Sequence, residues 1–225
     1  MNGRKSGSSS AVLFDLDGTL IDSAPDLAGA ANDLRASHGL SAMPYAKLRP
    51  MVGSGARGMV GAAFDVTPED NRFAELRDAF LARYAQRLLQ QTVVFAAMAP
   101  VLDSLDAAGV RWGIVTNKAT RFAQPVINGL GLAQRAAVFI AGDTTPYAKP
   151  HPAPLLEAAR RLVLPPAACV YVGDDLRDVE AGRAAGMATL AAAWGYLGQG
   201  EAIADWGADS ILSSPAQLLH WLELA

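Results

Sequence analysis

The sequence predicts an α/β fold, a doubly wound parallel sheet with a small α-helical domain inserted after the first strand. Three observations support this prediction. Residues 11–14 form a short apolar run that ends in an acidic turn. Residues 25–90 have helical spacing and lack strand signals. From about residue 93 onward, apolar runs alternate with helical segments, which is the pattern of a parallel sheet covered on both faces.

The remaining elements follow in chain order. The inserted block contains predicted helices at 26–38 and 68–89, the second beginning with Thr67 as N-cap, followed by Pro68 and two acidic residues. Strands are then predicted at 111–115, 137–141, 169–172, 188–192 and 210–212. Helices are predicted at 99–108, 120–130, 152–162, 176–185 and 215–222. We expect right-handed crossovers between these strands, giving a Rossmann-like core.

The length of 225 residues corresponds to about 1.5 average domains. We expect residues 1–22 and 93–225 to form the core, with 1–10 flexible, and residues 23–92 to form the helical domain. A hydrophobic content of 51% and a charged content of 18% exclude a disordered chain. The net charge of −3 provides no basic surface for nucleic acid or for an anionic membrane.

The chain contains one cysteine, Cys169, in an apolar run, so we expect a buried and unreactive thiol. The first apolar stretch is too short for a secretory signal, and no uncharged run reaches the roughly 20 apolar residues of a membrane span. We therefore expect a cytoplasmic protein without a membrane partner.

Polar residues recur where the predicted strands end. They are Asp15 and Asp17, Thr116 and Asn117, Lys149, and Asp174, Asp175 and Asp178. The carboxyl ends of parallel strands meet in one crevice, so these side chains should converge.

The first pair, Asp15 and Asp17, would face one side of an extended chain. Two close carboxylates suit a nucleophile beside a general acid/base. Gly18 permits a sharp turn, and Thr19 adds a hydroxyl and a backbone N–H for a phosphate oxygen. The alternatives are a solvated acidic turn or a calcium loop. An EF-hand is disfavoured because a strand precedes the turn and glycine stands at the fourth position rather than the sixth.

The segment Phe14-Asp15-Leu16-Asp17-Gly18-Thr19 resembles the opening motif of the haloacid dehalogenase-like hydrolase superfamily. Three further motifs follow in the same order, at 116–117, at 149–150 and at 173–178. The resemblance implies that Asp15 is the nucleophile, that Asp17 is the acid/base, and that Thr116 and Lys149 assist catalysis. It further implies a Mg²⁺ ion held by Asp15, the Asp17 carbonyl and Asp174, with Gly18, Thr19 and Asn117 near the phosphate. The acid at position 17 favours phosphoryl transfer over carbon–halogen cleavage.

The fourth motif departs from the pattern, because Asp175 replaces the more usual serine or threonine. Asp175 could bind the metal, orient Lys149 or a metal-bound water, or do neither. We expect Asp178 to act by orienting such groups rather than as a direct ligand.

The helical block resembles the cap of the phosphoglycolate phosphatase and β-phosphoglucomutase branch, which closes over the site. Within the segment 48–58, Arg49 and Arg57 are candidate substrate anchors or ordinary surface charges. The same segment contains a G-x-G-x-x-G pattern at 53–58, which is typical of dinucleotide-binding sites. Such a site needs a strand just before the pattern, and Pro50 argues against a strand there. We therefore interpret this segment as a glycine-rich cap loop that contacts substrate. The segment 194–196 could line the crevice or could bury apolar surface.

These features predict a Mg²⁺-dependent phosphatase of a small phosphorylated metabolite, most similar to phosphoglycolate phosphatases. Residues 116–118, 172–180 and 206–209 are also similar to bacterial N-acetylmuramic acid 6-phosphate phosphatases. A phosphosugar mutase, which shares the nucleophile and the acid, and a non-catalytic binding module are the remaining alternatives. The oligomeric state stays open.

Overall fold

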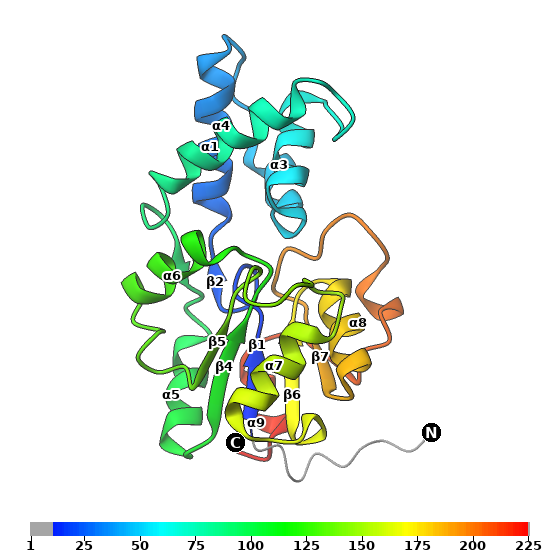
Figure 1. The fold of residues 1–225 in the computed structure, drawn as a ribbon. Helices are drawn as coiled ribbons and strands as arrows, with labels where there is room; N and C mark the ends of the chain where they lie inside the picture. Colours follow the sequence, from blue (N-terminus) through cyan, green and yellow to red (C-terminus); the bar gives the residue numbers. More distant parts are fainter. Residues whose placement is uncertain (1–10, 225) are drawn as a thin grey trace.

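The computed structural model describes residues 11–224, so the flexibility expected of residues 1–10 concerns residues outside the described range. Its centre is a six-stranded, all-parallel sheet in the order β5-β4-β1-β6-β7-β8 (Figure 1). The strands are β1 (Ala11–Phe14), β4 (Arg111–Val115), β5 (Val138–Ile140), β6 (Cys169–Gly173), β7 (Ala188–Ala192) and β8 (Ser210–Leu212). The predicted fold class is confirmed.

The first strand, β1, lies at the middle of the sheet and pairs with both β4 and β6. It is buried on both faces, since Val12 and Phe14 enter the core on one side and Ala11 and Leu13 enter the core on the other. Because the chain runs outward from β1 in both directions, the loops after β1, β4 and β6 lie next to one another.

Helices cover both faces of this sheet. Apolar residues of α5 (Ala99–Ala107), α6 (Thr120–Gly129) and α9 (Ala216–Trp221) pack on one face, and those of α7 (Ala153–Leu162) and α8 (Leu176–Ala185) pack on the other. These bounds differ from the predicted ones by at most two residues. Short 3-10 turns at Pro166–Ala168 and Ile203–Asp205 complete the core. Cys169 is buried, as predicted.

The helical block forms its own hydrophobic core above the sheet (Figure 1). It consists of α1 (Ala24–Ser37), α2 (Tyr45–Leu48), a 3-10 helix (Arg49–Ser54), α3 (Gly55–Phe64) and α4 (Phe73–Ala85). Phe122 and Tyr196, from the sheet domain, are packed into this second core.

Two predictions within the block are wrong. The second helix does not begin at Pro68, because Asp70 accepts a hydrogen bond from the Arg72 backbone N–H (2.8 Å) and holds a turn there. The glycine-rich segment 53–58 is not a loop, because it spans the junction between the 3-10 helix and α3. Gly58 allows this packing, since a Cβ there would lie 2.9 Å from the Met51 carbonyl oxygen.

The two connections between block and core pair with each other. They form a two-stranded antiparallel ribbon of β2 (Ile21–Asp22) and β3 (Val93–Val94). Inside this junction, Asp26 of α1 accepts hydrogen bonds from the backbone N–H and the hydroxyl of Thr92, both at 2.8 Å. The block is thus tied to the core at both crossings. Within residues 11–224, none of the helices has the length and apolar character needed to cross a bilayer.

Candidate active site

The turn after β1 brings the first predicted site residues beside the end of β6. The Asp15 backbone N–H donates to the Val172 carbonyl (2.9 Å). Gly18 has a φ of 88° and lies so close to Asp174 that a Cβ would meet Asp174 Oδ2 at 2.2 Å. The Thr19 hydroxyl donates to Asp174 Oδ1 (2.8 Å). Glycine and threonine at these positions therefore shape the turn around the Asp174 carboxylate.

Three carboxylates converge at this point. Oxygen atoms of Asp15, Asp174 and Asp178 lie within 4.8 Å of one another. Burial, opposed by the charge of Lys149, raises the pKa of Asp15 to about 7. Burial and the charge of Asp15 raise the pKa of Asp174 well above its usual value. The cluster carries more negative charge than Lys149 offsets, and such oxygen ligands suit a hard divalent cation.

Lys149 is the cation inside the cluster. Its Nζ lies 2.9 Å from Asp15 Oδ1 and 2.7 Å from Asp178 Oδ1. Burial disfavours the charged amine, but Asp15 and Asp178 raise the pKa of Lys149 above its usual value. Asp15 Oδ1 is buried, and its contact with Lys149 does not meet hydrogen-bond geometry. This oxygen therefore has no well-aligned hydrogen-bond partner. An unsatisfied carboxylate oxygen beside two others supports the fit to a metal ion.

Asn117 positions Lys149. Its Oδ1 accepts from the Lys149 backbone N–H, and its Nδ2 donates to the Lys149 carbonyl, both at 2.9 Å. Thr116, at the end of β4, lines the same cavity, and its hydroxyl accepts from the Lys118 backbone N–H (3.1 Å). The side chain of Asn117, which we expected near the phosphate, therefore binds the backbone of Lys149.

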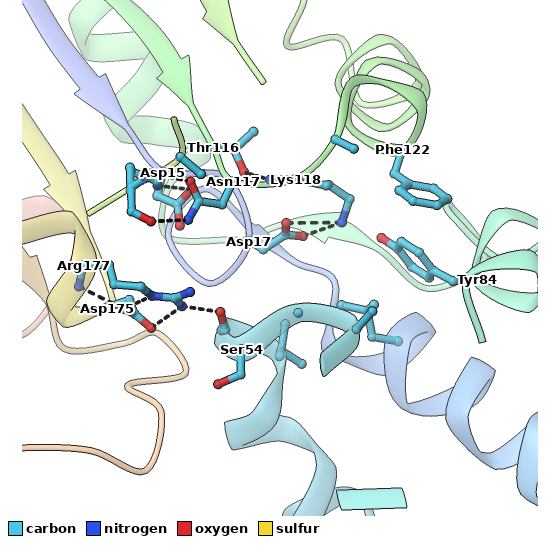
Figure 2. A pocket seen from close by; sticks show the side chains of 18 of the residues that line it. Asp15, Asp17, Ser54, Tyr84, Thr116, Asn117, Lys118, Phe122, Asp175 and Arg177 are labelled. Carbon is cyan, nitrogen blue, oxygen red and sulfur yellow. Dashed lines mark hydrogen bonds and ion pairs between the residues drawn. The ribbon is translucent and has the colours of Figure 1, made fainter. Parts of the chain in front are cut away.

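Lys118 is a site residue to which sequence reasoning gave no role. Its Nζ pairs with both Asp17 oxygens (2.9 and 3.2 Å) and lies 4.7 Å from the ring centre of Tyr84 in α4. The Ser23 hydroxyl also donates to Asp17 Oδ1 (2.5 Å). Figure 2 shows Asp17 and Lys118 facing each other, with Tyr84 and Phe122 beside the lysine. Asp17 is held by these two partners, apart from the three-carboxylate cluster.

Asp175 and Asp178 both shape the start of α8. Asp175 is its N-cap, accepts from the Arg177 backbone N–H (3.0 Å) and pairs with the Arg177 guanidinium (2.7 Å). Asp178 completes the capping box by accepting from the Asp175 backbone N–H (3.2 Å). Of the two, only Asp178 belongs to the carboxylate cluster, and Asp175 lines the cavity while it caps α8 and pairs with Arg177.

These groups surround a cavity of about 470 Å³ between the sheet and the helical block. Its basic wall residues are Lys118, Arg121, Lys149 and Arg177, and its apolar wall includes Leu27, Val52, Phe80, Leu81, Tyr84 and Phe122. Among the described residues, Arg121 alone of these four forms no ion pair, and its guanidinium stacks 4.5 Å from the Phe122 ring centre.

The two arginines singled out in the block do not line this cavity. Arg49 donates to the Gly195 carbonyl (3.2 Å) and stacks on Tyr196, and Arg57 is exposed on α3. Sequence reasoning gave neither Arg121 nor Arg177 a role: Arg121 follows the second motif by a few residues, and Arg177 lies within the fourth motif but was not singled out there.

The family model of the haloacid dehalogenase-like hydrolases matches residues 10–186. An N-acetylmuramic acid 6-phosphate phosphatase of Pseudomonas putida is 42% identical over 215 residues, which is 96% of this chain and 96% of that protein. A phosphoglycolate phosphatase of Xanthomonas campestris pv. campestris is 47% identical over 209 residues, 92% of this chain and 94% of that protein. A solved structure described as a predicted phosphoglycolate phosphatase of Haemophilus somnus 129PT superposes with a TM-score of 0.83, at 28% identity over 97% of this chain and 99% of that one.

Proposed function

The chain belongs to the haloacid dehalogenase-like hydrolase family, and on that premise we propose that it is a phosphatase that hydrolyses the phosphate monoester of a small metabolite. One observation carries the proposal. Asp15, Asp17, Lys149 and Asp174, which come from three separate strand ends, border a single cavity. The names of the relatives, which are phosphatases of small phosphorylated molecules, support the same reaction class.

A divalent metal fits the carboxylate cluster, and we propose Mg²⁺ because the donors are oxygen atoms. Asp15 and Asp174 would hold it with the Asp17 backbone carbonyl, and Asp178 lies close enough to bind it or to orient its water. The ion would supply positive charge that lowers the repulsion between the Asp15 carboxylate and the phosphate.

Asp15 begins the reaction in this proposal. One of its carboxylate oxygens attacks phosphorus, the bond from phosphorus to the ester oxygen breaks, and Asp17 donates its proton to the leaving alkoxide. The products of this step are an alcohol and an aspartyl-phosphate. Asp17 then takes a proton from water as the water attacks phosphorus, the bond between Asp15 and phosphorus breaks, and inorganic phosphate leaves with Asp17 protonated again.

The other residues hold charge in place. The Lys149 amine, 2.9 Å from Asp15, offsets the charge that gathers on the phosphoryl oxygens. Thr116, which lines the cavity, would bind those oxygens, whereas the backbone N–H groups of Gly18 and Thr19 already donate to the carbonyls of Ile21 and Leu16.

The helical block supplies the wall for the leaving group, and we assign residues 23–92 as a cap domain on this basis. Core residues 1–22 and 93–225 would then carry the phosphoryl chemistry. Arg57, which lies outside the cavity, and Arg49, which bonds to the Gly195 carbonyl of the core, are weaker candidates for substrate contact than Arg121, which lines the cavity.

For the substrate we propose 2-phosphoglycolate first, with N-acetylmuramic acid 6-phosphate as the second candidate. The second candidate is favoured by a specific observation, because a cavity of about 470 Å³ with Phe80, Tyr84 and Phe122 on its wall has room and aromatic surface for a sugar. A phosphosugar mutase would instead yield an isomerised phosphosugar without free phosphate. A phosphorylated metabolite is consistent with the cytoplasm, which we propose as the compartment.

The discriminating experiment is a kcat/KM comparison over 2-phosphoglycolate, N-acetylmuramic acid 6-phosphate and several hexose phosphates, measured as phosphate release with Mg²⁺. We expect at least a tenfold preference for one of the first two, which corresponds to about 1.4 kcal/mol. Stoichiometric isomerisation of a hexose phosphate without phosphate release would favour the mutase. No release from any of the esters would overturn the proposed function.

A further inference from the structure

We propose that Tyr196 is a positioning residue whose hydroxyl fixes Ser23, and through Ser23 orients Asp17 for protonation of the leaving alcohol. This inference rests on the proposed phosphatase function. It accounts for the segment Trp194-Gly195-Tyr196, which lies in the loop after β7 and does not line the cavity.

The Tyr196 hydroxyl is fully engaged at the first crossing between core and block. It accepts from the backbone N–H groups of Ser23 (2.9 Å) and Ala24 (3.1 Å), and it donates to Asp22 Oδ1 (3.0 Å). A hydroxyl has one donor and two acceptor sites, so all of them are used. Tyr196 is buried, with 4% of the residue exposed.

The start of α1 has no side-chain cap. Ser23 is the N-cap residue of α1, but its side chain makes no capping hydrogen bond. Its hydroxyl donates instead to Asp17 Oδ1 at 2.5 Å. The phenol accepts the backbone N–H groups of Ser23 and Ala24 and so fixes the start of the helix, while the Ser23 hydroxyl is bonded to the candidate acid/base instead of capping the helix.

The rest of the loop anchors the phenol to the core. The Tyr196 backbone N–H donates to Asp174 Oδ2 (2.8 Å), and the Trp194 indole N–H donates to the Thr19 carbonyl (3.1 Å). On the side of the block, the Arg49 guanidinium lies 4.9 Å from the Tyr196 ring centre. Tyr196 thus contacts Asp174 through its backbone and Ser23 through its hydroxyl, and Ser23 in turn donates to Asp17. A movement of the start of α1 would therefore move the group that orients the acid/base.

The proposed role predicts a dependence on the leaving group. An alkyl phosphate needs a proton on the departing oxygen, whereas p-nitrophenolate leaves without much help. A phenol that orients the acid should therefore affect alkyl esters more than p-nitrophenyl phosphate. A general structural defect would slow both substrates alike.

The experiment measures kcat/KM of Tyr196→Phe with 2-phosphoglycolate, N-acetylmuramic acid 6-phosphate and p-nitrophenyl phosphate. For the preferred alkyl ester, we expect a loss about tenfold larger than the loss for the aryl ester, a part of the roughly 10²–10⁴ that a positioned acid contributes. Ser23→Ala should show the same pattern. If both residues act through Asp17, the double variant should lose no more than Ser23→Ala alone. Tyr147→Phe, at an exposed tyrosine outside the cavity, is the matched control and should resemble the wild type.

Equal losses on alkyl and aryl esters, or fully additive effects of the two variants, would overturn the inference while leaving the phosphatase function intact. If circular dichroism shows that Tyr196→Phe is unfolded, the test rests on Ser23→Ala. An unchanged ratio of alkyl-ester to aryl-ester kcat/KM in Ser23→Ala would refute the proposed orientation of Asp17 through Ser23. A wild-type protein without activity on any of the three esters would overturn the proposed function, and the inference would fail with it.

Discussion

Replacing Gly195 by alanine should weaken metal binding without a change of charge or of polar groups. An ideal Cβ at Gly195 would lie 2.1 Å from Asp174 Cβ and 2.5 Å from Asp174 Oδ2. Gly195 has no positive φ, so the effect of the substitution is steric rather than a matter of backbone strain. Because carbon atoms in contact need about 3.5 Å, the Asp174 side chain must move by about 1.4 Å.

That movement disturbs the hydrogen bonds to Asp174 from Thr19 and from the Tyr196 backbone, each 2.8 Å long. Loss of the groups that orient a metal ligand costs about 10–100-fold in metal affinity, or about 1.4–2.7 kcal/mol. The assay is a Mg²⁺ titration followed by tryptophan fluorescence, since Trp194 lies in the same loop.

The control is Gly200→Ala, also in the loop after β7, where a Cβ meets nothing within 4 Å and φ is not positive. We expect Gly200→Ala to titrate like the wild type and Gly195→Ala to need at least tenfold more Mg²⁺. Equal midpoints for Gly195→Ala and the wild type would refute the placement of Asp174 in the metal site.

Three further predictions concern the charges around the cavity. Chelation of divalent metal should abolish phosphate release and lower Tm, because a ligand that binds the native state stabilises that state. Added Mg²⁺ should restore the activity and the Tm, and turnover that persists in chelator would contradict the metal site. Lys118→Met leaves the partly buried Asp17 carboxylate without its cation, so the free energy of unfolding in urea should fall by about 3 kcal/mol, and a change below about 1 kcal/mol would count against the pair. Arg121→Gln should lower kcat/KM for 2-phosphoglycolate about tenfold relative to ethyl phosphate, because a hydrogen bond to a charged group contributes about 1.5–3 kcal/mol. Arg57→Gln, outside the cavity, should leave this ratio unchanged. A lower ratio in Arg57→Gln and an unchanged ratio in Arg121→Gln would instead identify Arg57 as the residue that binds the substrate carboxylate.

The sheet domain could be predicted from local pattern. Buried parallel strands have continuous apolar sequences, as at Ala11–Phe14 and Ala188–Ala192, and these runs identified the strands almost to the residue. The helix Gly55–Phe64 was missed because three of its residues are glycine, which lowers helix propensity in the isolated sequence. In the folded chain, packing against α1 and α4 outweighs that local preference.

The site could be predicted where a residue directly follows a strand. Asp15, Thr116 and Asp174 converge because parallel strands bring their carboxyl ends to one edge. Contacts between core and block followed no such rule. Tyr196 meets Ser23 across 173 positions, and this contact depends on how the block packs on the core, whereas Lys118 and Asp17 both follow core strands. Local spacing holds no information on that packing.

Trapping the phosphoryl group on Asp15 tests the central claim most directly. Purified protein is mixed with the preferred phosphate ester and Mg²⁺, quenched in acid within milliseconds, digested, and analysed by mass spectrometry for phosphorylated peptides. We predict a phosphorylated aspartate at position 15 in the wild type, with no labelled peptide and no turnover in Asp15→Asn. A label on any other residue, or phosphate release by Asp15→Asn at the wild-type rate, would contradict the account.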